Sequence, residues 1–106
     1  MTNTTKETAM NLYLVLRRSG WRSAEDLTEA AARSTAAGAE MTEDLRWIRS
    51  YVLEEGNGLG TVCVYEATGP EAIRAHASQA LLPVDEIIPV ADTGVVRPDP
   101  VRETAR

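Results

Sequence analysis

Alternating side chains mark the first structured segment of the chain. From Asn11 to Arg17, leucines at every second position alternate with Asn11, Tyr13 and Val15. A period of two residues is typical of a β-strand, because successive side chains point to opposite faces of a sheet. The pattern therefore predicts a strand over 11–17.

Helical spacing follows over 24–39, where Leu27 and several small residues recur every three or four positions. Ser23 stands ahead of Glu25 and Asp26, and a hydroxyl followed by acidic residues is a usual helix start. The alanine content also favours a helix that packs closely on a sheet. We expect the first helix over this range.

Two further β-rich segments, 44–53 and 61–67, flank a glycine-rich run that contains Asn57 and Gly58. The dipeptide Asn-Gly between two hydrophobic segments is a strong turn signal. These two segments are therefore predicted to pair as a β-hairpin.

A second helix is predicted over 70–80, because proline is tolerated in a first helical turn and Thr68 or Gly69 can cap it. Pro83 stops this helix, since proline cannot continue the backbone hydrogen bonding. A last short strand is expected over 86–91.

The element order β, α, β, β, α, β with right-handed crossovers is that of a ferredoxin-like fold. This α+β fold has a four-stranded antiparallel sheet with two helices on one face. The predicted domain covers 11–92, between a flexible N-terminal segment, 1–10, and a flexible, proline-containing C-terminal tail, 93–106.

The sheet face without helices predicts a homodimer. We expect the other face, beneath the helices, to carry the aliphatic residues Leu12, Leu14, Leu16, Ile48, Val52, Val62 and Val64. The helix-free face would then carry Tyr13, Val15, Trp47, Arg49, Tyr51, Cys63 and Tyr65. An apolar face of this kind is not normally left in water. Two sheets packed through it would enclose a cleft lined by aromatic rings, an arginine and a thiol.

The charge balance argues against nucleic acid as a partner, because the net charge is −5 and the basic residues are scattered. The densest basic group, Arg17, Arg18 and Arg22, is explained by a strand end and a loop. Cys63 is the only cysteine, which excludes an intrachain disulfide and suits a reducing compartment. No apolar stretch approaches the length of a membrane span, so no membrane partner is expected and the predicted location is cytoplasmic.

Four separated blocks resemble one known family: EDL…AAARS at 25–34, RWIRSYV at 46–52, CVYEA at 63–67 and AIRAHA…LPVDEI at 72–87. This is a family of short domains of unassigned function, whose members are commonly labelled nickel-binding proteins and are similar to dimeric α/β-barrel proteins. The resemblance implies a fold of the dimeric α/β-barrel type. It also implies that the ligand is nickel or another divalent transition metal. The chain departs from the family at Leu81, because family members often have a glycine at this position, where the second helix ends.

His76 is the only histidine, and a transition-metal site would begin with it because nickel favours an imidazole nitrogen. Cys63 is the natural soft ligand, while Tyr51 and Tyr65 on adjacent strands can coordinate weakly. A carboxylate such as Glu71 is a further candidate, and a two-fold dimer would offer each group twice. Each residue also has an ordinary structural explanation, as a buried histidine, a packed thiol, cross-strand aromatics or a solvated acid.

Tyr13, Trp47 and Arg49 form the second candidate site, a cleft that would orient an anionic or phenolic ligand. No catalytic or nucleotide-binding motif is present, so neither a nucleotide nor a flavin is expected. Three hypotheses follow. The protein is a dimeric metal-binding protein, a cofactor-free enzyme or binding protein for an aromatic or polyketide-like metabolite, or a plain dimeric interaction module. The sequence leaves open whether it is an enzyme.

Overall fold

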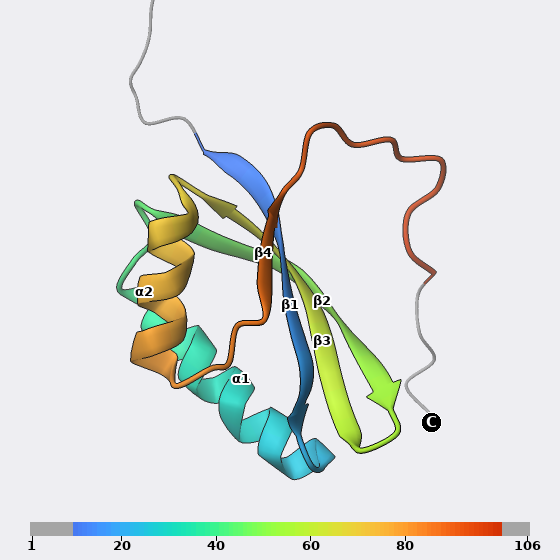
Figure 1. Ribbon diagram of the computed structural model, residues 1–106. Helices are drawn as coiled ribbons and strands as arrows, with labels where there is room; N and C mark the ends of the chain where they lie inside the picture. Colours follow the sequence, from blue (N-terminus) through green and yellow to red (C-terminus); the bar gives the residue numbers. More distant parts are fainter. Residues whose placement is uncertain (1–9, 101–106) are drawn as a thin grey trace, which may run out of the picture.

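The computed structural model describes residues 10–100 and contains all six predicted elements in the predicted order. The predicted flexible segment 1–10, apart from Met10, and the last residues of the predicted tail 93–106 lie outside the described residues. The elements, labelled in Figure 1, are β1 (Asn11–Trp21), α1 (Ala24–Ala39), β2 (Leu45–Glu55), β3 (Gly58–Ala67), α2 (Pro70–Ala80) and β4 (Glu86–Pro89).

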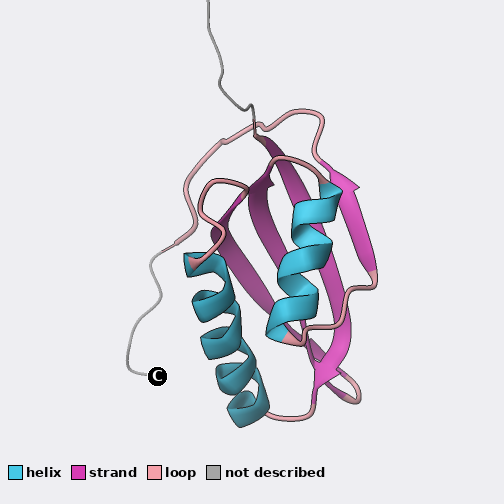
Figure 2. Ribbon diagram, turned by 90° about the vertical axis from the view of Figure 1, so that its left-hand side faces the viewer, coloured by secondary structure: helices cyan, strands magenta, loops and turns pink. Residues whose placement is uncertain are grey.

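The four strands form one antiparallel sheet in the order β2-β3-β1-β4. Both helices cover the same face of this sheet, as Figure 2 shows from the side of the helices. The arrangement confirms the predicted ferredoxin-like α+β fold. No helix within residues 10–100 is long and apolar enough to cross a membrane.

The helix boundaries follow from local sequence. At the start of α1, the Ser23 hydroxyl accepts a hydrogen bond from the backbone N–H of Asp26 at 3.2 Å, which satisfies one of the free donors of the first turn. Helix α2 begins with Pro70 after Gly69. It ends at Ala80 and is capped by Leu81, whose φ of 59° lies in the left-handed region that glycine adopts most readily.

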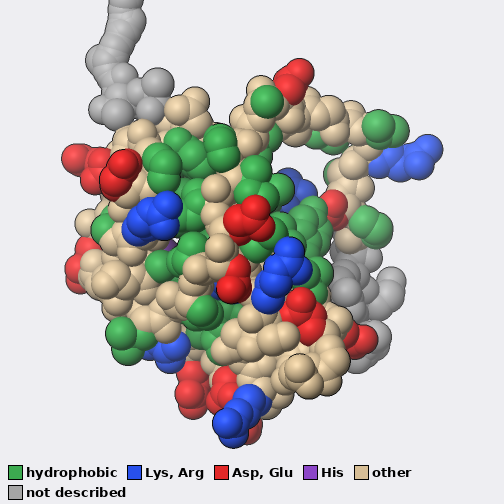
Figure 3. All heavy atoms as spheres, in the orientation of Figure 1, with side chains coloured by type: hydrophobic (Ala, Val, Ile, Leu, Met, Phe, Trp, Pro, Cys, Tyr) green, Lys and Arg blue, Asp and Glu red, His purple; other side chains and the backbone are tan. Residues whose placement is uncertain are grey.

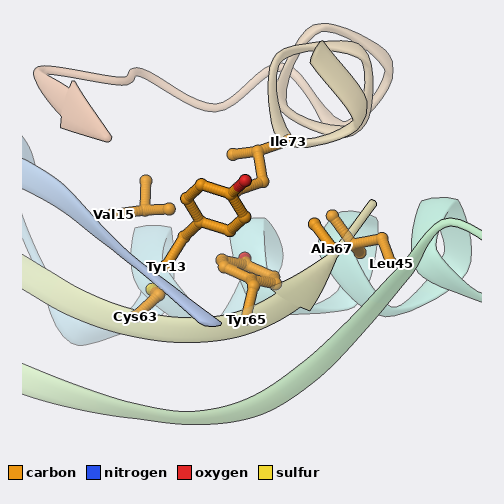
Figure 4. Packing of buried hydrophobic residues seen from close by; sticks show 7 residues of the cluster. All are labelled: Tyr13, Val15, Leu45, Cys63, Tyr65, Ala67 and Ile73. Carbon is orange, nitrogen blue, oxygen red and sulfur yellow. The ribbon is translucent and has the colours of Figure 1, made fainter. Parts of the chain in front are cut away.

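The predicted assignment of the two sheet faces is wrong for β1 and β3. Residues directly opposite in an antiparallel pair share a face, and Tyr13 pairs with Tyr65 while Val15 pairs with Cys63. All four are buried beneath the helices. Figure 4 shows Tyr13, Tyr65 and Ile73 in the same core, together with Leu45, Ala67 and the other members of the cluster.

The leucines of β1 consequently lie on the helix-free face, with Val62 and Val64 of β3 opposite Leu16 and Leu14. The prediction failed because both rows of each strand are apolar, so alternation reveals two faces without showing which one the helices cover. The helices are rich in alanine, and their short side chains leave depth that the tyrosine rings fill.

A β-bulge in β2 separates residues that were expected to share a face. Trp47 pairs with Tyr65, whereas Arg49 pairs with the next residue of β3, Val64, so that Ile48 is an extra residue without an opposite partner. Trp47 therefore lies on the helix-covered face, and Arg49 lies on the helix-free face. The simple alternation assumed for this strand holds only on either side of the bulge.

The segment after β4 runs beside the helix-free face rather than continuing the sheet (Figure 1). Its Asp99 carboxylate accepts hydrogen bonds from Arg49 Nη1 at 3.0 Å and from the Tyr51 hydroxyl at 2.8 Å. A space of about 820 Å³ lies between this segment and the sheet. In Figure 3 the same segment stands out from the body of the domain and leaves an opening.

Candidate functional site

A cavity of about 260 Å³ lies between α1 and the helix-covered face of the sheet. Ala30, Ala31 and Ser34 are part of its α1 side, and their small side chains leave space there. The sheet contributes residues from β1, β2 and β3, namely Arg17, Trp21, Trp47, Ser50, Val52, Thr61, Cys63 and Tyr65. Leu27, Thr28 and Leu82 complete the lining.

Arg17 is the charged group of this cavity, and it is only 1% exposed. Its Nε, Nη1 and Nη2 atoms have no hydrogen-bond partner among residues 10–100. The guanidinium carbon lies 5.9 Å from the centre of the Tyr65 ring, within the range of a cation–π contact. The predicted strand ended at Arg17, whereas β1 continues to Trp21, so Arg17 lies within the strand and is buried.

The sequence did contain a signal for Arg17. It follows Tyr13 and Val15 at the next alternate position and pairs with Thr61, so it shares their face. Once those two residues are known to lie beneath the helices, the strand period places Arg17 there as well.

His76 is also 1% exposed and lies where α2 meets α1. Its Nε2 atom is 3.0 Å from the backbone oxygen of Ser34 and 3.4 Å from the Ser34 hydroxyl. Because a carbonyl oxygen only accepts hydrogen bonds, Nε2 carries the proton and Nδ1 carries the lone pair. Nδ1 has no partner within the described residues. Burial lowers the pKa of His76, which keeps the imidazole neutral.

Tyr65 connects the two buried groups. Its ring meets the His76 ring edge to face, with 5.6 Å between the ring centres, and it stacks on Trp47 at 6.4 Å. Burial raises the pKa of Tyr65, although the positive charge of Arg17 opposes part of that rise. Tyr65 is therefore a neutral phenol between an imidazole and a guanidinium.

The structure brings three of the four predicted metal ligands to the same side of the sheet. Cys63 is buried there in the row of Tyr65, with its thiol 3.5 Å from the Thr61 hydroxyl, and it lines the cavity beneath α1. Tyr51 lies on the opposite face, next to Asp99. Within residues 10–100, no group of three or more histidine, cysteine or acidic side chains is close enough to hold a metal ion.

The predicted cleft of Tyr13, Trp47 and Arg49 does not form as one site. Tyr13 belongs to the core and Trp47 borders the cavity beneath the helices. Arg49 faces the other way and is bonded to Asp99 and Tyr51. The bulge in β2 and the reversed faces of β1 together account for the separation.

The fold defines a class: a small α+β domain of the ferredoxin-like type, here with buried polar groups beneath the helices. The sequence profile described as "Nickel responsive protein SCO4226-like" matches residues 13–90. The chain therefore belongs to the SCO4226-like family of nickel responsive proteins.

A solved structure supports the fold. The crystal structure of SCO4226 from Streptomyces coelicolor A3(2) matches with a TM-score of 0.63 and 18% sequence identity. The match covers 78% of this chain and 99% of that chain. No curated protein is significantly similar to the chain in sequence.

Proposed function

We propose that this protein binds a divalent transition metal such as nickel, with Nδ1 of His76 as the nitrogen donor. One observation carries the proposal: Nε2 of His76 is held by the Ser34 carbonyl at 3.0 Å, while Nδ1 is buried and unpartnered within the described residues. Metal-binding histidines characteristically donate their other ring N–H to a carbonyl or carboxylate, which orients the lone pair. The family description, nickel responsive, is consistent with such a role.

The donor set fits nickel in part. A neutral imidazole is a suitable nickel ligand, and the lowered pKa of His76 keeps the lone pair free at neutral pH. Cys63 and Tyr65, on the same side of the sheet, are the proposed additional donors, whereas Tyr51 lies on the other face. One chain supplies only one histidine and one cysteine, so water completes the coordination.

We also propose that the protein is a homodimer formed through the helix-free face. Leu14, Val62 and Val64 are only partly buried there, and Ile48 is 45% exposed. A second copy would cover this apolar surface and fill the space beneath the segment that ends at Asp99. The single reduced cysteine is consistent with a cytoplasmic location.

Calorimetric titration of tag-free protein with nickel tests the metal proposal. His76→Gln is the informative variant, because its side-chain amide can still donate to the Ser34 carbonyl while the ring nitrogen is lost. Since His76 is buried between the helices, the titration needs slow additions that reach equilibrium. Saturable binding to the wild type that is lost in His76→Gln is expected. Equal binding by both proteins, or none by the wild type, would contradict the proposal.

Light scattering tests the dimer separately. Ile48→Asp places a charge on the exposed bulge of the helix-free face, and Leu81→Asp, at the exposed end of α2 on the helix side of the sheet, is the matched control. We expect a dimeric wild type and control and a monomeric Ile48→Asp protein. A wild type that is monomeric at all concentrations would remove the dimer from the proposal.

Binding of a small organic ligand is the second candidate function, and one observation favours it. The cavity of about 260 Å³ contains an arginine, but it lies beneath α1 rather than in the predicted sheet-face cleft.

A further inference from the structure

The guanidinium of Arg17 is a buried charge without a counter-ion in the described part of the chain. The ion pairs found within residues 10–100 involve other arginines, Arg46 with Glu66 and Arg49 with Asp99. An isolated charge in a protein interior is strongly unfavourable, so buried charges are normally paired or hydrogen-bonded. All three nitrogens of Arg17 lack a partner there. This is the state expected of a group whose anion comes from outside the chain.

The surroundings of Arg17 indicate the kind of anion. No acidic residue lines the cavity, and its remaining polar groups are the neutral side chains of Thr28, Ser34, Ser50, Thr61, Cys63 and Tyr65 with the indoles of Trp21 and Trp47. Alanine, leucine and valine side chains supply the rest of the wall. Such a site offers one cation, Arg17, surrounded by aromatic and aliphatic walls. That combination suits an organic acid better than an inorganic oxyanion, which needs donors on every side.

The size of the cavity and the position of its mouth further limit which ligands can bind. The volume of about 260 Å³ is below the roughly 300–1,000 Å³ of pockets for drug-sized ligands. Trp47 and Val52 are 39% and 54% exposed, so they lie at the mouth of the cavity, while Arg17 lies inside. The Trp47 indole N–H donates to the Ser50 hydroxyl at 2.8 Å, which holds the ring in place beside Tyr65.

We propose that this cavity binds a small aromatic carboxylate, with the carboxylate on Arg17 and the ring of the ligand against Trp47 and Tyr65. A planar guanidinium matches a carboxylate with two parallel hydrogen bonds. Aromatic side chains favour offset or edge contacts with a flat ring. The proposal does not require metal binding, because it uses neither His76 nor nickel, although Cys63 and Tyr65 are named in both sites.

The probes are benzoate, phenylacetate and indole-3-acetate, with benzamide as a neutral analogue of benzoate and inorganic phosphate as a plain anion. Binding is measured by calorimetry and by tryptophan fluorescence, since Trp21 and Trp47 both line the cavity. We expect saturable binding of at least one carboxylate. The amide should bind at least tenfold more weakly than benzoate if benzoate is the carboxylate that binds.

Arg17→Met removes the charge and keeps the length of the side chain, and it should lower carboxylate affinity at least tenfold. Arg49→Met, on the opposite face, is the matched control and should bind like the wild type. If Arg17→Met does not fold, Ala31→Leu gives an independent test, because it fills the cavity from α1 and leaves Arg17 in place. It should also lower the affinity at least tenfold.

Absence of binding by all three carboxylates would overturn the proposal, as would equal binding by wild type and both cavity variants. Binding of phosphate alone would show an anion site of another class and would also overturn it. The two proposals fail separately: His76→Gln should keep carboxylate binding, and Arg17→Met should keep nickel binding.

Discussion

Stability below neutral pH should depend on His76, the only histidine of the chain. Its ring is 1% exposed, and burial is the largest cause of its lowered pKa. The Ser34 carbonyl partly opposes the shift, and the positive charge of Arg17 adds to it. Protonation would place a second positive charge in the same interior, beside the neutral phenol of Tyr65. The folded protein therefore resists a proton that the unfolded chain accepts freely.

The sign and size of the effect follow from proton linkage. Above the ordinary histidine pKa of about 6.5, the ring is neutral in both states and the free energy of unfolding does not respond to it. Below that pH the unfolded chain binds a proton and the folded protein does not. Stability then falls as the pH falls, by at most about 1.4 kcal/mol per pH unit, until the folded-state pKa is reached.

Urea unfolding of wild type and His76→Gln between about pH 5 and pH 8 measures this dependence. Carboxylates titrate alike in both proteins, so the difference between the two free energies isolates His76. We expect this difference to be constant above about pH 6.5. Below that pH, the wild type should lose stability relative to His76→Gln. A difference that stays flat over the whole range would refute the assignment of His76 as a buried neutral imidazole.

Three substitutions test the packing and the helix ends. Ile73→Ala should lower the free energy of unfolding by about 2–5 kcal/mol, because Ile73 is fully buried in the core; a smaller loss in urea unfolding would contradict that placement. Ser23→Ala should cost about 1 kcal/mol by removing the N-cap of α1, and an unchanged unfolding midpoint would argue against the cap. Leu81→Gly should raise stability by up to about 1 kcal/mol, because Leu81 is 72% exposed and has a φ of 59°. A lower melting temperature in Leu81→Gly would show that the leucine makes a contact worth more than its backbone strain.

The elements and the fold followed from local signals. Ser23 and its acidic neighbours marked the start of α1, and the Asn57-Gly58 turn marked the hairpin. These signals are reliable because capping and turn geometry depend on residues within a few positions of one another. The family also followed from the sequence, since the matched residues 13–90 contain all four of the quoted blocks.

The candidate sites were harder to predict from the sequence than the fold was. Tyr51 and Arg49 were expected to share a sheet face with Cys63 and Tyr65, but they lie on the other face. The error came from one inserted residue, Ile48, at the bulge. A bulge changes the face of the following residues through pairing with a neighbouring strand, and the sequence of β2 alone carries no clear mark of it.

The sequence by itself determined the six elements, their order and the family, because each rests on local backbone preferences or on recognisable blocks of residues. Only the tertiary structure decided which face of the sheet the helices cover. Both rows of β1 are apolar, and the choice depends on how alanine-rich helices and tyrosine rings fill a common volume. That choice buries Arg17, which the sequence analysis placed at the end of a strand, without a hydrogen-bond partner in the described chain, and Arg17 becomes the centre of a proposed binding site.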